Sequence, residues 1–342
     1  RVLGINVAAV YTGLSLGPFV GGLLTQNLGW RSIFLAVVPL GLLVIAFVLW
    51  RLKGEWAEAQ GEAFDLGGSI LYSLALVALM YGFTSLPGTS GAVLLLMGAV
   101  ALAAFVIWET RVRNPVLNLS LFANNRTFAL SNLAALINYG ATSAVAFLLS
   151  LYLQYIKDLS PQQAGLVLIA QPIVQAALSP VAGRLSDRIE PRIVASAGMT
   201  ITAIGLALLV LVGSATPLWA IVACLILLGF GFALFSSPNM NAIMSSVEKK
   251  FYGVASGTAG TMRLVGQMLS MGIATLLFAL FIGRVAITPE AYPLFLASMK
   301  TAFAVFAALC VGGIVASLGR GNIREDNDEE RRHTALPSTS DH

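Results

Sequence analysis

The stretch that decides the fold is residues 12–34, which read TGLSLGPFVGGLLTQNLGWRSIF. Gly13, Gly17 and Gly21 are spaced four residues apart, so they share one face of a helix and let a neighbouring backbone approach closely. Pro18 follows the second glycine directly and favours a bend, because it removes one intrahelical hydrogen bond. The pattern indicates a kinked, tightly packed membrane helix, although small residues at this spacing also serve as a general packing device.

The rest of the chain repeats this apolar character. Of its 342 residues, 57% are hydrophobic and 11% are charged, whereas an ordinary soluble domain carries about 25% charged residues. This small number of charged residues cannot cover the surface of a soluble protein, and lipid is therefore the predicted solvent. Each span of a bilayer needs about 20 apolar residues. Because backbone groups must be bonded internally in lipid, the sequence predicts an all-α integral membrane protein. The ten predicted spans are roughly 3–24, 31–50, 66–86, 91–108, 127–153, 163–182, 192–213, 217–238, 253–282 and 294–318.

Lysine and arginine residues indicate how these spans are oriented. If the N-terminal end of the first span faces the cytoplasm, fifteen of the twenty lie in cytoplasmic connections and tails, four lie on the opposite side, and Arg263 lies inside a span. An excess of lysine and arginine is typical of cytoplasmic loops. We therefore expect a multi-pass protein of the cell membrane, in bacteria the inner membrane, with a cytoplasmic C-terminus. The net charge of +4 reflects this orientation and gives no reason to expect nucleic-acid binding.

Other residue types exclude several functions. Cys224 and Cys310 both fall in apolar segments, so we expect small buried side chains rather than a disulfide framework. His333 and His342 are in the polar C-terminal tail, so neither a metal site nor a histidine-dependent catalytic site is expected within the membrane. The spans offer no buried nucleophile–base pair, so we expect no enzyme activity and no cofactor.

The opening motif resembles one in a known family. Gly13, Gly17, Pro18, Gly21 and Gly22 are similar to motif C, which lies in the fifth helix of exporters of the major facilitator superfamily. The residues that follow are similar to the tryptophan–arginine–phenylalanine opening of their sixth helix. Over nearly the whole chain, the order of motifs resembles that of the fourteen-helix drug:proton antiporters of the EmrB/QacA type.

The resemblance implies a domain organisation. Residues 1–54 would be the last two helices of an N-terminal bundle, residues 55–125 two extra central helices with a cytoplasmic linker, and residues 126–319 a six-helix C-terminal bundle. Residues 320–342 would be a disordered cytoplasmic tail, because they are polar and carry an acidic cluster. On this interpretation the chain begins at helix five of fourteen, and the first four helices of the major facilitator fold are absent.

A second motif lies at residues 183–192, between the sixth and seventh predicted spans. It resembles the second copy of motif A, and the resemblance implies a cytoplasmic gate loop in which a charge cluster latches the gate. In physical terms, Asp187 can approach a helix N-terminus while the neighbouring arginines pair with it; a merely basic connection is the alternative. The gate-loop residues are Gly183, Arg184, Asp187, Arg188 and Arg192.

Polar residues inside the spans are the candidates for a substrate cavity. Arg263 lies about ten residues past the start of its span, hence roughly 15 Å deep, and should face protein or water. The uncharged candidates also fit the role of hydrogen-bonded contacts between helices, worth under about 2 kcal/mol each. No aspartate or glutamate lies inside a predicted span, so the carboxylate for proton coupling is expected in the absent helices. The candidate cavity residues are Asn138, Tyr139, Gln171, Gln175, Arg263 and Gln267.

Together these features predict a secondary transporter that exports drugs or other amphipathic compounds, with protons as the coupling ion. A carrier of a specific metabolite is the alternative, because motif C marks exporters without naming their cargo. A non-transporting membrane scaffold is a third interpretation, but it gives no reason for the Gly-Pro bend or for the charge cluster.

Overall fold

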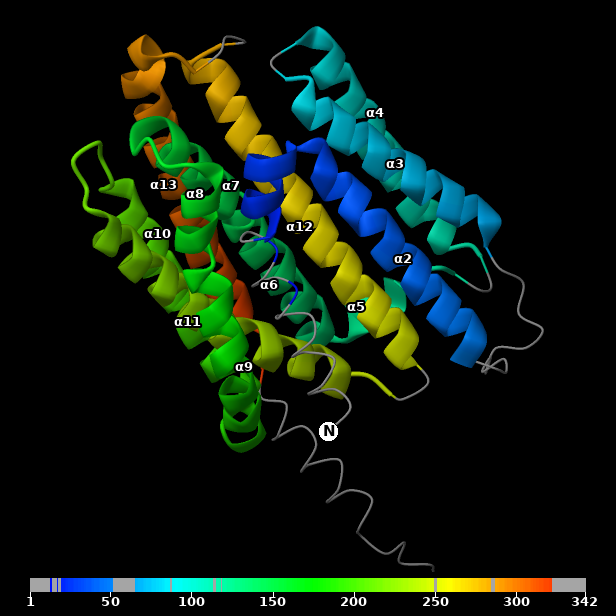
Figure 1. Cartoon of the computed structure of the whole chain (residues 1–342). Helices are drawn as coiled ribbons and strands as arrows, with labels where there is room; N and C mark the ends of the chain where they lie inside the picture. Colours follow the sequence, from blue (N-terminus) through cyan, green and yellow to red (C-terminus); the bar gives the residue numbers. More distant parts are fainter. Residues whose placement is uncertain are drawn as a thin grey trace, which may run out of the picture.

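The computed structural model describes residues 13, 17, 20–51, 65–86, 88–112, 115–117, 119–248, 251–283 and 287–321 (Figure 1). The regular elements within these ranges are helices, and residues 20–28 are also helical. The bounds are α2 (Arg31–Arg51), α3 (Leu66–Thr84), α4 (Thr89–Glu109), α5 (Leu119–Asn124), α6 (Arg126–Thr142), α7 (Val145–Leu151), the π-helical turn η1 (Tyr152–Ile156), α8 (Pro161–Leu168), α9 (Ala170–Arg188), α10 (Pro191–Val210), α11 (Leu218–Ser245), α12 (Tyr252–Phe281), the 3-10 turn η3 (Pro289–Ala291) and α13 (Tyr292–Leu318).

Nine helical stretches of the described chain are long and apolar enough to cross a membrane. They coincide with nine of the ten predicted spans, from 31–50 to 294–318. The first predicted span, 3–24, lies mostly outside the described residues. The prediction of an all-α membrane protein is therefore confirmed for the part of the chain that the structure describes.

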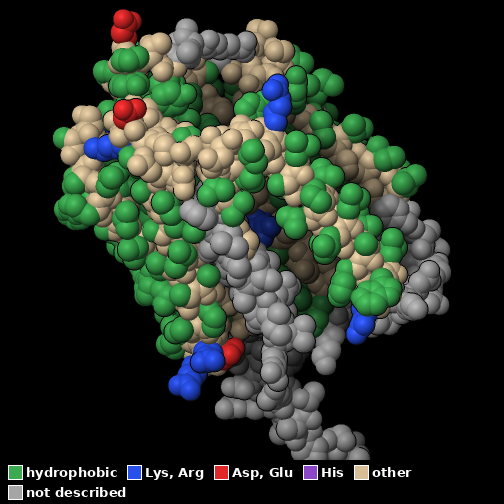
Figure 2. Space-filling view, viewed as in Figure 1, with side chains coloured by type: hydrophobic (Ala, Val, Ile, Leu, Met, Phe, Trp, Pro, Cys, Tyr) green, Lys and Arg blue, Asp and Glu red, His purple; other side chains and the backbone are tan. Residues whose placement is uncertain are grey.

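The surface of the molecule suits contact with lipid. Hydrophobic side chains cover most of the face seen in Figure 2, and most of its charged side chains lie at the two ends. One basic side chain is an exception and lies in a recess in the middle of that face. Leu35, Leu49 and Leu211 are each more than 70% exposed, which would promote aggregation in water but is the expected arrangement against acyl chains.

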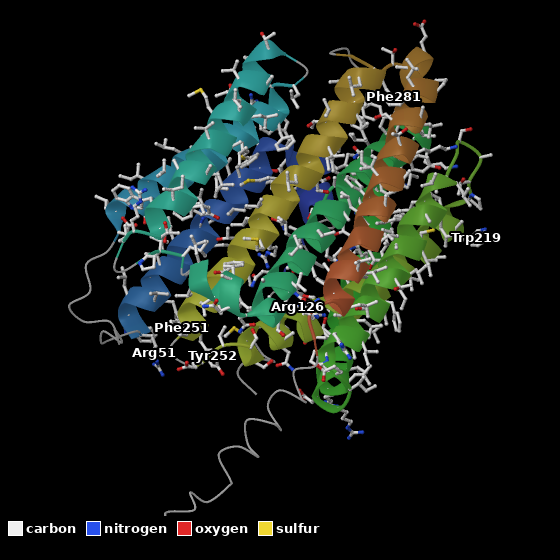
Figure 3. All side chains as sticks on the ribbon, turned by 180° about the vertical axis from the view of Figure 1, so that it is seen from behind. Arg51, Arg126, Trp219, Phe251, Tyr252 and Phe281 are labelled. Carbon is white, nitrogen blue, oxygen red and sulfur yellow. The ribbon has the colours of Figure 1, made fainter. Side chains whose placement is uncertain are left out.

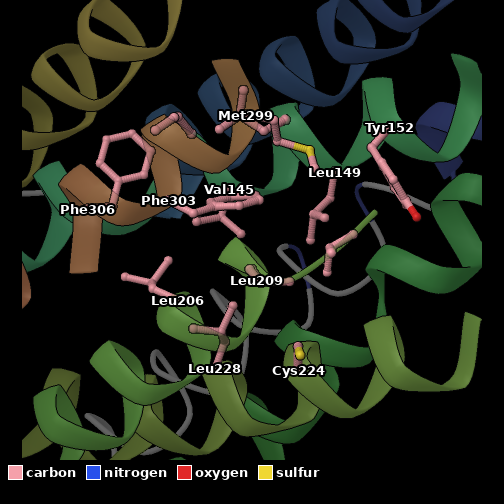
Figure 4. Packing of buried hydrophobic residues seen from close by; sticks show 14 of the residues in the cluster. Val145, Leu149, Tyr152, Leu206, Leu209, Cys224, Leu228, Met299, Phe303 and Phe306 are labelled. Atoms are coloured by element: carbon pink, nitrogen blue, oxygen red, sulfur yellow. The ribbon is translucent and has the colours of Figure 1, made fainter. Parts of the chain in front are cut away.

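Helices α6 to α13 pack into one bundle (Figure 1). Within it, α10 packs against α11 and α13, α11 packs against α9, and α6 packs against both α12 and α13. The core is apolar, and Leu149, Leu209 and Phe303 are fully buried where α7, α10 and α13 meet (Figure 4). Cys224 and Cys310 belong to the same cluster as free, buried thiols, which confirms their predicted role as small core side chains.

Glycines allow the helices of this bundle to approach one another closely. A Cβ atom at Gly198 of α10 would lie 2.7 Å from the carbonyl oxygen of Gly231 in α11. A Cβ atom at Gly266 of α12 would lie 2.7 Å from the carbonyl oxygen of Leu136 in α6. Both distances are shorter than carbon–oxygen contact permits, so a larger residue at either position would push two helix backbones apart.

Two of the spans are broken rather than continuous. The span formed by α6, α7 and η1 breaks near Ala144, whose backbone N–H donates to the Ser270 hydroxyl of α12 at 2.9 Å. The span formed by α8 and α9 breaks at Ile169. Pro172 lacks the N–H that would bond to the Leu168 carbonyl in a continuous helix, which explains the second break. The prediction of one continuous helix per span is therefore wrong for these two spans.

Helices α3 and α4 form a hairpin that lies beside α12 (Figure 1). The contact is close at Gly272 of α12, where a Cβ atom would lie 2.9 Å from the Cβ atom of Phe83 in α3. Nearer the other end of α3, the Tyr72 hydroxyl forms a hydrogen bond with Thr261 of α12. The hairpin is therefore attached to the bundle at two levels.

Both ends of α2 carry a tryptophan–arginine pair. Arg31 Cζ lies 4.9 Å from the ring centre of Trp30, and Arg51 Cζ lies 5.6 Å from that of Trp50. The pairs are 20 positions apart, which at 1.5 Å per residue is about 30 Å, the thickness of the hydrocarbon core. Because tryptophan and arginine favour the membrane interface, the two pairs set the depth of α2.

The spans run in alternating directions, as the charge distribution predicts. Figure 3 shows Arg51, the last residue of α2, at the same end of the molecule as Tyr252, the first residue of α12. Phe281, the last residue of α12, lies at the opposite end. The end that holds Arg51 and Tyr252 is the one to which the sequence assigns most lysines and arginines.

The close contact of α10 with α11 can be tested by substitution. Gly198→Val should lower the free energy of unfolding by about 1–3 kcal/mol, because the added side chain overfills the contact with Gly231. Gly312→Val in α13 is the matched control, since a Cβ atom at Gly312 would have nothing within 4 Å. Thermal unfolding of the purified protein in detergent measures both effects. Equal effects of the two substitutions would contradict the close-contact interpretation.

Candidate functional site

The predicted cavity residues lie on three helices and form two groups. The first group is Asn138 and Tyr139 on α6 with Arg263 and Gln267 on α12, and the second is Gln171 and Gln175 on α9. Two members of the first group lie at the contact of α6 with α12, because a Cβ atom at Gly266, which precedes Gln267, would lie 2.8 Å from the Cβ atom of Tyr139. The α9 pair meets a different helix: the Gln171 carbonyl oxygen lies 2.5 Å from the position of a Cβ atom at Gly229 of α11.

Burial distinguishes the candidates further. Asn138 is fully buried and Gln175 is 9% exposed, whereas the other uncharged candidates are partly exposed. Arg263 is exposed, although it lies eleven residues into α12 and hence about 16 Å from the helix start at 1.5 Å per residue. A guanidinium at that depth is too costly against acyl chains. This face of α12 must therefore border water or protein.

Asn138 is a polar group without side-chain partners in the middle of a span. Its backbone carbonyl accepts a hydrogen bond from Thr142 Oγ1 at 2.6 Å. Its side-chain nitrogen and oxygen are both buried, and neither has a hydrogen-bond partner among the described residues. Leaving a buried polar group unpaired costs about 1–3 kcal/mol. A polar group that reached Asn138 would therefore be bound favourably.

Carboxylates in the described spans are confined to the span ends. Asp65 precedes α3, Glu109 is the last residue of α4, and Asp187 is the last but one of α9. Glu290 is the second residue of the span that ends with α13. The described spans thus provide no acidic group in the middle of the membrane.

The predicted gate loop is wrong in its secondary structure. Helix α9 continues to Arg188, and the next helix begins at Pro191, because proline suits the first position of a helix. Only two residues connect the helices. Of the five predicted loop residues, α9 contains Gly183, Arg184, Asp187 and Arg188, and the first turn of α10 contains Arg192.

The end of α9 is attached to α11. Asn241 Nδ2 of α11 donates to Ser186 Oγ at 3.2 Å and to Asp187 Oδ1 at 3.5 Å. The expected capping of the next helix by Asp187 is not observed, because the N-cap residue of α10 is Glu190 and it makes no side-chain capping bond. The latch role of this cluster stays a prediction.

A buried polar network includes a residue that the sequence assigned to the tail. Arg320 follows α13 and is 1% exposed. Its Nη1 donates to Ser131 Oγ at 3.0 Å and to Asn239 Oδ1 at 2.7 Å, and its Nη2 donates to Ser317 Oγ at 2.8 Å. The assignment of residue 320 to a disordered tail is therefore wrong, and the residue belongs to the bundle.

The network joins the same ends of four helices. Ser131 and Asn239 bring in α6 and α11, as described above. Ser196 Oγ of α10 donates to Ser317 Oγ of α13 at 2.8 Å. The backbone carbonyl of Arg320 accepts a further bond from Thr127 Oγ1 of α6 at 2.7 Å. One residue thus connects α6, α10, α11 and α13.

The charge of Arg320 explains why its surroundings are polar. The pKa of Arg320 is lowered to about 10, mainly by burial. The charge of Glu190 opposes this shift, and the charge of Arg192 adds to it. The guanidinium therefore keeps its charge at neutral pH, and a buried charge is costly unless it is bonded. One signal in the sequence was available, because Ser317 and Arg320 are three residues apart and share a helix face.

The motif C helix touches the C-terminal bundle at one glycine. In the helical stretch 20–28, a Cβ atom at Gly22 would lie 2.6 Å from the carbonyl oxygen of Pro161, the first residue of α8. Gly22 thus approaches the bundle closely, but it lies next to the face shared by Gly13, Gly17 and Gly21, on which the close approach was predicted, and Pro18 lies outside the described residues. No described residue lies within 4 Å of a Cβ atom at the other glycines of the motif, Gly13, Gly17 and Gly21.

Comparisons with known proteins point in one direction. The family model described as Major Facilitator Superfamily matches residues 132–340. The chain is 30% identical to the riboflavin transporter RibZ of Clostridioides difficile, over 83% of this chain and 61% of that protein. It is 31% identical to the multidrug resistance protein Stp of Mycobacterium tuberculosis, over 80% of this chain and 51% of that protein.

A further relative is the tetracenomycin C resistance and export protein of Streptomyces glaucescens. The two are 27% identical over 83% of this chain and 53% of that protein. The chain therefore spans between one half and two thirds of the length of the curated relatives it matches.

The Arg320 network predicts a large effect on stability. Arg320→Gln should lower the free energy of unfolding by about 2–4 kcal/mol, because three buried acceptors lose their donor. Arg320→Lys should also destabilise the protein, since a lysine keeps the charge but cannot bond in the geometry of a guanidinium. Thermal unfolding in detergent checks both, with Arg184→Gln on the exposed side of α9 as the control. A loss no larger than that of the control would show that the network is dispensable.

Proposed function

The chain belongs to the major facilitator superfamily, and we propose that the protein exports drugs or other amphipathic compounds across the cell membrane by proton antiport. The observation that carries this proposal is the contact of Gly22 with the start of α8. It brings a motif typical of exporters against the C-terminal bundle at the end of α8 where positive charge is sparse. Among the relatives, one is named for multidrug resistance and another for resistance and export.

We place substrate recognition on the facing sides of α6 and α12. Tyr139 and Gln267 offer polar groups near the contact of these helices, and Asn138 of α6 adds an amide that has no hydrogen-bond partner among the described residues. Arg263 adds a positive charge that faces away from lipid. Few polar groups in apolar surroundings suit an amphipathic ligand, because the apolar walls bind its body and the polar groups fix its orientation. Gln171 and Gln175 on α9 would extend the site if α9 moves toward α12.

The orientation in the membrane follows from charge. The ends of the spans that hold Arg51, Arg126 and Arg188 are the basic ends, and basic ends face the cytoplasm. The C-terminus and the Arg320 network then lie on the cytoplasmic side, and the contact at Gly22 lies on the far side. We place the protein in the bacterial inner membrane, in keeping with its relatives from bacteria.

Proton coupling needs a titratable group that responds to substrate or to a change of conformation. The described spans hold no carboxylate at mid-membrane depth, so we expect the coupling carboxylate outside the described residues. The charged end of α9, where Asp187 is bonded to Asn241, would then stabilise one state of the cytoplasmic gate. This is the latch role predicted from the sequence.

A carrier of one metabolite is the second candidate. The similarity to a protein named as a riboflavin transporter favours it, because such a carrier would use the same fold with a more selective site. The two candidates differ in the number of chemically unrelated compounds that the cells expel. A panel of dyes and drugs tested beside riboflavin therefore distinguishes them.

Transport of a fluorescent cationic dye tests the main proposal. Cells that express the full-length gene should lose the dye faster than control cells, and an uncoupler that collapses the proton gradient should abolish the difference. Equal retention in expressing and control cells across the compound panel would refute drug export. Efflux that persists with the uncoupler would refute proton antiport but would leave the proposal of drug export intact.

The glycine contact predicts a matched pair of transport phenotypes. Gly22→Val should reduce the efflux rate by at least about tenfold, because its side chain meets the Pro161 carbonyl and holds the two halves apart, and a loss of about 1.4 kcal/mol already has that effect. Gly312→Val should leave efflux near the wild-type rate, since a Cβ atom there would have nothing within 4 Å among the described residues. Efflux is measured at equal protein amounts in the membrane.

The cavity residues predict a separation of transport from folding. Asn138→Ala, Gln175→Ala and Arg263→Gln should each change the rate or the range of exported compounds while the amount of folded protein stays within about twofold, because polar contacts inside a bundle contribute under about 2 kcal/mol. Size-exclusion profiles measure the folded amount. A parallel loss of folded protein and of efflux would assign these residues to structure instead.

A further inference from the structure

The base of the α3–α4 hairpin brings two carboxylates together. Asp65 directly precedes α3, and Glu109 is the last residue of α4. Asp65 Oδ2 and Glu109 Oε1 both lie within 2.6 Å of the point that a Cβ atom at Gly68 would occupy. The two oxygens are therefore less than about 5 Å apart, a distance at which two negative charges repel each other strongly. Only a glycine at this position leaves room for both.

Asp65 is well provided with donors. Its Oδ1 accepts the Gly68 backbone N–H at 2.9 Å, and the Trp108 indole N–H lies 3.0 Å from its Oδ2 and 3.2 Å from its Oδ1. It also stands at the N-terminus of α3, where the positive end of the helix dipole favours a carboxylate. These contacts provide hydrogen-bond donors to both oxygens of the Asp65 carboxylate.

Glu109 is in the opposite situation. Its side chain is 4% exposed, and its Oε1 is buried and has no hydrogen-bond partner within the described part of the chain. Its Oε2 accepts only backbone donors, among them Leu117 N at 2.9 Å. The C-terminus of α4 is the negative end of the helix dipole and disfavours a second negative charge. An ionised Glu109 would therefore be buried, half unpaired and next to another anion.

Among the described residues, which do not include Arg113, the other charged groups nearby do not relieve this conflict. On α3, the ionisable side chain that faces Glu109 is Asp65, and the Tyr72 hydroxyl farther along α3 is bonded to Thr261. After α4, Arg111 is exposed, and residues 115–117 are Pro, Val and Leu. No ion pair to Glu109 is found in the described chain.

We propose that Asp65 and Glu109 form a proton-binding site, in which Glu109 is the carboxylic acid and its O–H donates to Asp65 Oδ2. The proton removes the repulsion and gives the unpaired Oε1 a partner. A divalent cation is the poorer occupant, because calcium takes six to eight oxygen ligands and magnesium six. The described residues also hold no group of three or more side chains suited to a metal ion.

The proposed proton would control the base of the hairpin. Its loss leaves the buried Glu109 carboxylate next to the partly exposed Asp65 carboxylate, so the two like charges separate. Trp108 is bonded to the first and Leu117 to the second, so the end of α4 and the segment after it move with them. This site does not depend on the proposed transport function, and it binds a proton whether or not transport is coupled to protons.

Tryptophan fluorescence of the purified chain in lipid nanodiscs tests the site. The emission should show one step as the pH is raised and Glu109 loses its proton, and the step should be absent from Trp108→Phe. Glu109→Gln should abolish the step, because its amide still bonds to Asp65 but cannot lose a proton. Asp65→Asn should move the step to lower pH, because the neighbouring charge is gone. Trp219→Phe and Glu290→Gln are controls at the far end of the molecule and should keep the step.

Infrared difference spectra give an independent reading of the same site. A protonated carboxyl band should disappear as the pH is raised across the step, and Glu109→Gln should lack it. If Glu109→Gln does not fold, Gly68→Ala replaces it, since its methyl group separates the carboxylates and should move the step to lower pH. A wild-type protein without the step, a step unchanged in these variants, or a step that follows sodium concentration instead of pH would overturn the proposal.

Discussion

The structure depends on the absence of water around the backbone in the bilayer. There, each N–H and C=O must find its partner within the protein, so each described span is helical. Where a helix is broken, another group has to take the place of the missing bond. Ser270 does so at the break between α6 and α7, where its hydroxyl accepts the Ala144 N–H. At the helix ends, Asn125 accepts from Phe128 N at 2.8 Å and Asp65 accepts from Gly68 N at 2.9 Å.

The same cost of unpaired polar groups distinguishes Arg320 from Arg263. Arg320 is fully buried and bonded to three side chains at the ends of three helices, so its charge joins them. Arg263 lies much deeper and is exposed, so its charge cannot be satisfied by burial and needs water or another protein group. A bonded charge fits a structural role, whereas an exposed charge at mid-membrane depth fits a role in recognition.

The sequence predicted the features that follow from composition and periodicity. Nine spans, the buried cysteines and the alternating direction could be predicted because lipid imposes one secondary structure and a minimum length, although some helices run several residues past the predicted bounds. The break near Ala144 could not, since its free N–H is bonded to Ser270, 126 residues away, whereas Pro172 was a local signal for the break at Ile169. Arg320 was missed for a related reason: the positive-inside rule assigns an arginine to the cytoplasmic side but does not say whether it is solvated or buried. For the gate cluster, the sequence predicted a group of charged residues between two spans. It did not predict that α9 continues as a helix to Arg188.

Helix α12 is where these separate features meet. Gly266 lies against α6, Ser270 bonds to the break between α6 and α7, and Gly272 lies against Phe83 of the hairpin. These three positions span six residues, or about 9 Å of helix. A shift of α12 along its axis cannot change one of these contacts and leave the others intact, because a helix of this length moves as a rigid rod. Any movement of α12 that alters the surroundings of Arg263 must therefore also strain the break in the neighbouring span and the seat of the α3–α4 hairpin.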